Sequence, residues 1–314
     1  MNEFRFGYQV SRGDGDDLRR QAREAEAAGF DVISTWDHVA DGLTPLLPLL
    51  AMADVTDRIR VCPMVINNDF HHPVNLAMEF ADLDHLTGGR AELAIGAGHA
   101  FTEYTAMGLA FDPPAVRKRR LAESIEILRR LLDGETVTHR GEHYRITEAR
   151  IKRSLQDHLP IMAAVNGQAG LAHAAQHADI IGLMMLGKTL DDGNSHEVRW
   201  EADRLDATVA HIHEHAAGRP IELNALVQMI IVSDDRRAAA ENLCAAMPTL
   251  QVDDALDTPF LAIGTHDEIA EHFFRCRERW GISYLTVRSI PDFAPLIERL
   301  RTTPADSVSV TSAP

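Results

Sequence analysis

The sequence predicts an α/β protein folded as a (β/α)₈ TIM barrel. Short apolar runs rich in β-branched residues alternate with amphipathic stretches from one end of the 314-residue chain to the other. Such alternation is typical of β-then-α units that build a parallel sheet. About eight units in roughly 300 residues fit a closed barrel better than an open doubly wound sheet.

The expected elements follow one another in regular order. The strands are expected at Phe4–Val10, Phe30–Thr35, Ile59–Ile66, Ala91–Gly96, Pro160–Ala164, Asp179–Leu183, Ile221–Val232 and Ser283–Val287. The helices are expected at Asp16–Ala28, Pro45–Val55, Pro73–Leu86, Ala115–Leu132, a segment ending at His177, Val198–Ala216, Asp235–Ala246 and Asp267–Trp280, and Phe293–Leu300 is the last segment. Gly29 is expected to end the first helix, and Pro73 to open the third. Glu135–Ile146 breaks the alternation and predicts a surface hairpin, because Gly141 marks a turn between two β-rich runs.

The composition favours one globular domain. Hydrophobic residues make up 45% of the chain and charged residues 25%, which is enough apolar material for a sizeable core. We expect residues 1–302 to form a single domain, because no linker or low-complexity stretch divides them. Residues 303–314, rich in Ser, Thr, Pro and Val, are expected to be a disordered tail.

Charge and cysteine content exclude several classes of protein. The net charge of −16 repels phosphate backbones, so nucleic acid is not an expected partner. Three distant cysteines without a C-x-x-C pattern support neither a disulfide framework nor a zinc ribbon. The N-terminus has no basic and apolar leader pattern, and no apolar run reaches the ~18 residues of a spanning helix. We therefore expect a cytoplasmic protein that has no membrane partner.

Polar residues follow several predicted strands, where barrels of this kind place their chemistry. Trp36-Asp37-His38 follow the second strand; these side chains could stack on a planar cofactor, accept a ring N–H and move a proton. A capped loop around a half-buried Trp is the alternative. Gly96-Ala97-Gly98-His99 follow the fourth strand, and their glycines could let the backbone approach a flat ring. A plain tight turn is the alternative there. The third glycine of a dinucleotide fingerprint is missing and no helix is expected at this point, so that class of site is excluded.

Two further segments are candidates for binding anions. Asn67 and its polar neighbours lie directly before the helix that Pro73 opens, and a helix N-terminus favours anions. Asn166-Gly167 follow the fifth strand and could bind a phosphate through backbone N–H groups; an ordinary left-handed turn is the alternative. The remaining histidines, among them His211, His213 and His215, are interpreted as solvated surface. Their order H-I-H-E-H is not H-E-x-x-H, so no metal is expected.

Longer motifs resemble a known family. The run from Arg58 to Gly98, RIRVCPMVINNDFHHPVNLAMEFADLDHLTGGRAELAIGAG, resembles the bacterial luciferase-like flavin and deazaflavin oxidoreductases. EYTAMGLAFDPPAVRKRRLAESIEILRRLL from Glu103 and IGTHDEIAEHFFRCRERWGISYLTV from Ile263 also fit, so the resemblance covers nearly the whole chain in order. The stretches NNDFHHP and FDPP are similar to the actinobacterial branch that uses coenzyme F420, a deazaflavin.

The resemblance implies a site as well as a fold. It implies a homodimeric or larger barrel with the cofactor ring at the carboxyl ends of the strands, and a non-prolyl cis peptide within Pro63–Asn67. His38 would be the general acid/base, held by Asp37, and His99 a second polar group. His99 stands where relatives that oxidise sugar phosphates carry a glutamate, which argues against that substrate. The cofactor-binding residues would be Trp36, Val65, Ile66, Asn67, Ala97, Gly98, Asn166 and Gly167.

The expected function is hydride transfer between coenzyme F420 and a small organic substrate. One alternative is an FMN-dependent luciferase-like monooxygenase that uses O₂. The other is a catalytically silent flavin-binding member of the same fold.

Overall fold

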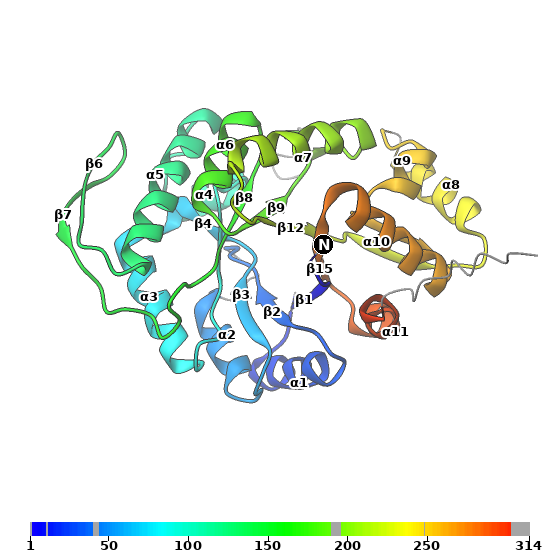
Figure 1. Ribbon diagram of the computed structural model, residues 1–314, viewed down its shortest axis with the longest axis horizontal. Helices are drawn as coiled ribbons and strands as arrows, with labels where there is room; N and C mark the ends of the chain where they lie inside the picture. The colour runs from blue at the N-terminus through cyan, green and yellow to red at the C-terminus, as the bar shows by residue number, and fades with distance from the viewer. Residues whose placement is uncertain (1, 11, 40–43, 190–195, 248, 303–314) are drawn as a thin grey trace, which may run out of the picture.

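A computed structural model describes residues 2–10, 12–39, 44–189, 196–247 and 249–302 as a barrel of parallel strands surrounded by helices (Figure 1). The main sheet has the strand order β3-β2-β1-β15-β12-β9-β8-β5-β4, and every neighbouring pair is parallel. These strands are β1 (Arg5–Gln9), β2 (Val32–Thr35), β3 (Arg60–Pro63), β4 (Ile66–Asn67), β5 (Leu93–Gly96), β8 (Ile161–Val165), β9 (Ile180–Leu183), β12 (Glu222–Leu226) and β15 (Ile282–Val287).

The sheet closes on itself through its third strand. β3 and β4 are two parts of one barrel strand, separated by a bend at the cis peptide Met64–Val65. A parallel bridge pairs Val61 of β3 with Ala91 just before β5, and β4 pairs with β5 directly. The nine strands of the main sheet therefore occupy eight positions, which confirms the predicted TIM barrel.

The helices pack on the outside of the barrel and enclose its main core. They are α1 (Gly15–Ala27), α2 (Leu46–Ala53), α3 (Pro73–Leu86), α5 (Pro114–Leu132), α6 (Gln168–His177), α7 (Ala202–Ala216), α10 (His266–Trp280) and α11 (Ile290–Arg301). A smaller buried cluster takes one side chain from each of six strands: Val32, Cys62, Ala94, Met162, Ile180 and Tyr284. Because strand side chains alternate between faces, this cluster fills the barrel interior while the intervening residues meet the helices.

Local signals set several helix ends close to where the sequence placed them, although the helix expected from Val198 begins at Ala202. Asp14 caps α1 by accepting hydrogen bonds from the backbone N–H groups of Asp16 and Asp17. α10 begins with a capping box between Thr265 and Glu268, and it ends at Gly281 in the left-handed conformation. The predicted surface hairpin is also present, as β6 (Val137–Arg140) paired antiparallel with β7 (Arg145–Ala149).

Several segments differ from the prediction. The strand expected over Ile221–Val232 is divided, since β12 stays in the barrel while β13 (Met229–Val232) pairs with the unpredicted β14 (Leu261–Gly264). Between β13 and β14 lie α8 (Arg236–Ala246), which was predicted, and α9 (Val252–Asp257), which was not. The segment after β9 contains an antiparallel pair, β10 (Leu186–Thr189) and β11 (His196–Val198).

The loop expected after Gly98 contains a short helix, α4 (Phe101–Met107), so the expectation that no helix opens there was wrong. The residue before this helix is Ala100, which has no side chain able to cap it, so the sequence carries no start signal. The predicted tail at 303–314 lies outside the described residues. Across the described ranges, no helix combines the length and the apolar character needed to cross a bilayer.

The amino-terminal ends of the strands are joined by a buried ion-pair network. Glu92, directly before β5, is almost fully buried and contacts both Arg5 of β1 and Arg60 of β3. Arg5 also pairs with Glu222 of β12 at 2.7 Å. This network therefore ties four strands together at the end of the barrel opposite the expected site.

Candidate active site

The carboxyl ends of β2 and β5 bring the predicted aromatic and imidazole side chains together. Trp36 and His38 follow β2, and their ring centroids lie 5.5 Å apart with an edge-to-face geometry. His99 follows β5, and its ring lies 5.7 Å from that of His38. The ring of His196 of β11, a residue that was not predicted to be part of the site, lies 5.4 Å from that of His99. One continuous rim of rings thus connects three loops of the barrel.

The carboxylate beside His38 is Glu103, and the predicted pairing with Asp37 is wrong. Nδ1 of His38 lies 2.6 Å from Oε1 of Glu103, whose side chain is only 12% exposed. Asp37 instead accepts the backbone N–H of Asn67 at 3.0 Å and lies 3.0 Å from Nε2 of His71. Neighbouring residues of an extended chain point to opposite sides, so Asp37 faces the third βα loop while His38 faces α4.

Glu103 was missed because it lies on the unpredicted helix α4. The usable signal for that helix is at its end, where Gly108 adopts the left-handed conformation of a C-cap glycine. An amphipathic segment ending at this glycine would have placed Glu103 near the carboxyl end of β5. The segment after β5 therefore supplies a carboxylate, Glu103, that was not predicted to be part of the site.

The turn at Gly98 is packed closely from two sides. Gly98 has φ +71°, and a Cβ there would collide with the Tyr104 hydroxyl and the Asn67 amide. The Tyr104 hydroxyl donates to Oδ2 of Asp69 at 2.9 Å, and burial raises its pKa, with the Asp69 charge adding to the shift. Arg117 of α5 donates to the backbone carbonyls of Ala97 and Gly98. These contacts hold the turn in one conformation, and the turn has only backbone atoms at Gly98.

Replacing Gly98 by alanine is expected to cost about 1–3 kcal/mol of folding free energy, because a Cβ forces a strained φ and a steric collision at once. Gly108→Ala is the matched control. Its φ of +69° is nearly the same, but no atom lies within 4 Å of the added Cβ. Urea unfolding of both variants measures the difference. An equal loss at the two positions would show that the collision at Gly98 is relieved by movement of Tyr104.

The bend between β3 and β4 confirms the predicted non-prolyl cis peptide and places it at Met64–Val65. Gln9 of β1 donates from its side-chain amide to the carbonyl of Met64 at 2.8 Å, and Arg288 in turn donates to Gln9 at 2.8 Å. Among the residues predicted to bind the cofactor here, the side chain of Val65 lies against Gly96. Ile66 is fully buried in the hydrophobic core, so its side chain does not line the rim.

His99 stays neutral over the physiological range. Desolvation by the surrounding protein, followed by the charges of His38, His196 and Arg117, lowers its pKa to about 4. A neutral imidazole can donate one hydrogen bond and accept another, so His99 is suited to orienting a polar substituent.

The depressed pKa of His99 predicts a loss of stability in mild acid. The unfolded chain takes up the proton near the ordinary value of 6.5, whereas folded His99 does so only near 4. The unfolded state therefore binds more protons between these values, and the free energy of unfolding falls as pH decreases from about 6.5 to about 4. Unfolding curves at several pH values should show a smaller fall in His99→Gln. Titration of the His99 ring signal by NMR near pH 6.5 would contradict the prediction.

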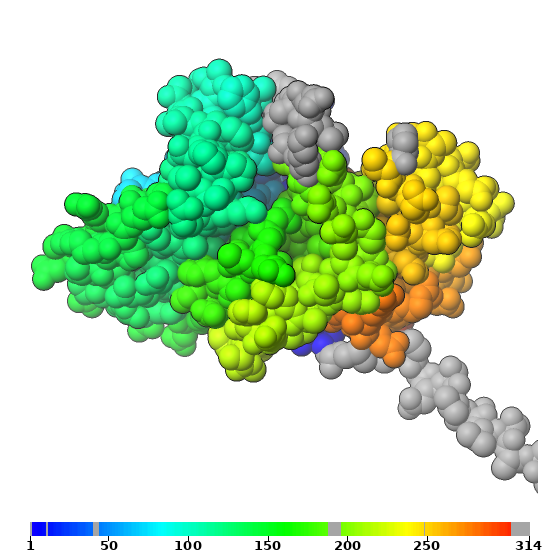
Figure 2. Space-filling model, turned by 90° about the horizontal axis from the view of Figure 1, so that it is seen from above, coloured from blue at the N-terminus to red at the C-terminus, as the bar shows by residue number. Residues whose placement is uncertain are grey.

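The predicted Asn166-Gly167 turn lies in a second part of the site. It lines a cavity of about 480 Å³, and residues of the β9–β10 connection and of α7 line the same cavity. The basic side chains on its wall are Lys118, Arg199 and Arg204. Figure 2 shows this hollow between the teal surface around the start of α5 and the green surface of the loops after β8 and β9.

The start of α6 gives this cavity the character of an anion site. Gly167, with φ +83°, is the N-cap residue of α6 and has no side chain. No side chain therefore caps the first N–H groups of this helix. Burial, together with the charge of Arg117, lowers the pKa of Lys118. Arg117 and Lys118 are neighbours on α5, one bound to the Gly98 turn and the other lining the cavity, so α5 connects the rim to the cavity.

Comparison with known proteins agrees with this architecture. Residues 3–251 match the luciferase-like monooxygenase family. An F420-dependent glucose-6-phosphate dehydrogenase of Nakamurella multipartita is 31% identical over 247 residues, which cover 76% of this chain and 70% of that protein. The chain spans about half the length of several other curated relatives.

Two solved structures show the same fold. An F420-dependent secondary alcohol dehydrogenase in complex with an F420-acetone adduct has a TM-score of 0.75 and 19% identity, over 96% of this chain and all of that chain. A monooxygenase from Streptomyces bottropensis has a TM-score of 0.74 and 19% identity, over 95% of this chain and all of the other. The family match covers most of the sequence and the barrel carries the expected rim, so the chain belongs to the luciferase-like monooxygenase family.

Proposed function

We propose that this protein is an F420-dependent oxidoreductase that transfers a hydride between the deazaflavin and a small alcohol or carbonyl compound. The observation that carries the proposal is the rim where His38, paired with Glu103, lies beside Trp36 and His99. The names of the dehydrogenase relatives support the same cofactor. When bound, the deazaflavin supplies the hydride chemistry, and the protein supplies orientation and control of the proton.

The residues of the rim fit a flat ring. At Gly98 the strand end has only backbone atoms, and the side chains of Tyr104 and Asn67, the latter only 6% exposed, occupy the space where a Cβ would lie. Ala97 and Gly98 would contact the ring through backbone atoms, and Trp36 would form a wall of the pocket. The anionic tail of the cofactor would enter the cavity at Asn166-Gly167, where the start of α6 and Lys118 favour negative charge.

In this proposal, Nε2 of His38 is the atom that accepts the proton of the substrate. Because Nδ1 of His38 faces the Glu103 carboxylate at 2.6 Å, the ring N–H is on Nδ1 and the lone pair is on Nε2. In the oxidation direction Nε2 takes the proton of the substrate hydroxyl while the carbon of that hydroxyl loses hydride. The Glu103 carboxylate then stabilises the imidazolium, and neutral His99 orients the substrate oxygen by a hydrogen bond. In the reverse direction the same imidazolium protonates the carbonyl oxygen.

Side-by-side titrations of the purified protein with F420, FMN and NADPH test the proposal. We expect saturable binding of F420, and loss of its oxidised absorbance when a panel of small alcohols is added. Lys118→Ala should weaken F420 binding, whereas Arg119→Ala should not, because Arg119 is on the same helix but is paired with Glu142 at the surface.

Two other results would favour the alternatives. Binding of FMN without F420, with O₂ consumption in the presence of reduced FMN, would support a monooxygenase like the structural neighbour from Streptomyces bottropensis. Tight F420 binding with no turnover of any alcohol or carbonyl would support a silent member of the fold.

A further inference from the structure

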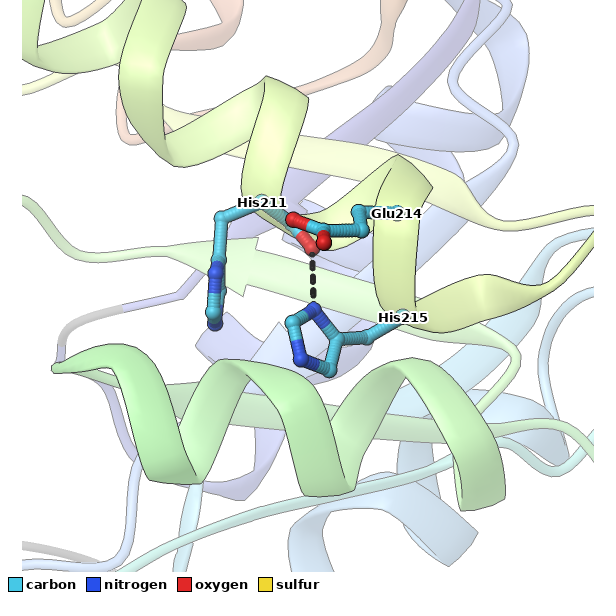
Figure 3. Close-up of side chains that lie close together, drawn as sticks. All are labelled: His211, Glu214 and His215. Atoms are coloured by element: carbon cyan, nitrogen blue, oxygen red, sulfur yellow. Dashed lines mark hydrogen bonds between the residues drawn. The ribbon is translucent and has the colours of Figure 1, made fainter.

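One turn of α7 places two imidazoles and a carboxylate on a single helix face. His211, Glu214 and His215 stand at positions i, i+3 and i+4, a spacing that brings side chains together on a helix. One potential ligand atom from each residue lies within 4.8 Å of the other two. Figure 3 shows both rings on the same side of α7, with the Glu214 carboxylate turned back toward His211. The two ring centroids are 4.2 Å apart.

Backbone carbonyls fix the tautomer of each ring. Nε2 of His211 lies 2.9 Å from the carbonyl oxygen of Gln168. Nδ1 of His215 lies 2.9 Å from the carbonyl oxygen of His211, as the dashed line in Figure 3 shows. A carbonyl only accepts, so each of these nitrogens carries the hydrogen. Nδ1 of His211 and Nε2 of His215 are therefore left with lone pairs. Metal-bound histidines are commonly oriented in this way, by donating their other N–H to a carbonyl or carboxylate.

A second cluster in the described part of the chain has similarly close ligand atoms, but its carboxylates already have partners within the protein. Glu123, Glu142 and His143 are equally close to one another. Glu123, however, accepts the backbone N–H groups of residues 142–144, and Glu142 is paired with Arg119. These carboxylates fasten the hairpin to α5. Glu214, by contrast, has no ion-pair partner among the described residues, so its carboxylate is available to a cation.

We propose that His211, Glu214 and His215 bind one Zn²⁺ per chain, with water in the remaining position. Two imidazoles and one carboxylate are a ligand set that zinc uses in proteins, with the fourth tetrahedral position open. These histidines were predicted to be solvated surface because their order is not H-E-x-x-H. The order here is H-x-x-E-H, which also puts both imidazoles on one helix face.

The bound ion would act next to the cavity at Asn166-Gly167. His211 lines that cavity and donates to Gln168, the first residue of α6. All three ligands are on α7, so zinc would hold the ring of His211 in the orientation that donates to Gln168, and would thereby strengthen this contact between α7 and the start of α6. This effect concerns the packing of two helices, and it does not depend on which cofactor the protein uses.

Zinc titration of the metal-free protein, in competition with a chromophoric chelator, tests this proposal. We expect one equivalent of Zn²⁺ to bind, and affinity to fall by at least about tenfold in His211→Ala and in His215→Ala. His213→Ala is the matched control, because His213 is an exposed histidine on the same helix and lies outside the cluster. Co²⁺ should give the visible absorption of a tetrahedral site in the wild type and in His213→Ala.

Thermal unfolding gives a second readout that does not need activity. A ligand that binds only the folded state raises the unfolding midpoint, so Zn²⁺ should stabilise the wild type and His213→Ala but neither of the two ligand variants. Far-ultraviolet circular dichroism of the metal-free variants checks that they are folded. Unchanged zinc affinity in both His211→Ala and His215→Ala, or an equal loss in His213→Ala, would overturn the proposal.

Discussion

Replacing His38 by alanine is expected to lower the rate of hydride transfer by ~10²–10⁴-fold, because the substrate hydroxyl loses its proton acceptor. Binding of F420 should change little, since the proposed cofactor contacts are at the Gly98 turn and the Asn166-Gly167 cavity. A single-turnover assay that follows the absorbance of the deazaflavin measures the chemical step directly. An unchanged single-turnover rate would remove His38 from the mechanism.

Glu103→Gln separates the role of the carboxylate from that of the ring. The amide keeps a hydrogen-bond partner for Nδ1 of His38 but removes the negative charge that stabilises the imidazolium. We therefore expect a smaller loss of the single-turnover rate than in His38→Ala. Asp37→Asn should lower that rate less than Glu103→Gln does, because Asp37 contacts His71 and the backbone of Asn67 rather than His38. An equal loss of rate in Asp37→Asn and Glu103→Gln would restore the pairing predicted from the sequence.

The barrel was predictable because its signals are local and repeated. Each β-strand is a short apolar run, and each helix end carries its own chemistry, as in the cap at Asp14 and the capping box at Thr265. The elements that were missed lack such signals. α4 begins after Ala100 without a side-chain cap, and β14 pairs with a strand far away in the sequence. Pairing of that kind depends on tertiary contacts, which a local pattern does not contain.

The site was predictable as a location but not as a set of contacts. Its main loops follow strands whose carboxyl ends must meet in a parallel barrel, so Trp36, His38 and His99 had to be near one another. Which carboxylate approaches His38 depends on the direction of each side chain. Adjacency in the sequence favoured Asp37, whereas the fold supplies Glu103 from a helix that begins five residues after strand β5. Contacts between loops are therefore the part of the site that required the structure.

The largest effect on stability is expected at the opposite end of the barrel, at Glu92. Its carboxylate is 1% exposed and lies between the guanidinium groups of Arg5 and Arg60. Arg5 lies over the ring of Tyr284, 4.4 Å from its centroid, and pairs with Glu222 as well. Burial raises the pKa of Glu222, although the charge of Arg5 opposes this shift. Glu92 is therefore the central anion of a network that closes the amino-terminal mouth of the barrel.

Glu92→Gln is expected to destabilise the protein by about 3 kcal/mol, because removing one partner of a buried ion pair leaves the other charges uncompensated. The lower end of the usual range applies, since the side chains of Arg5 and Arg60 are 26% and 28% exposed and water can solvate them in part. The control is Arg119→Ala, which breaks an ion pair whose side chains are 53% and 56% exposed and should cost less than about 1 kcal/mol. Guanidinium unfolding measures both variants. Activity per folded molecule should stay unchanged in Glu92→Gln, because the network and the His38 rim lie at opposite ends of the strands. Equal losses of stability in Glu92→Gln and Arg119→Ala would show that the Glu92 network is no stronger than a surface ion pair.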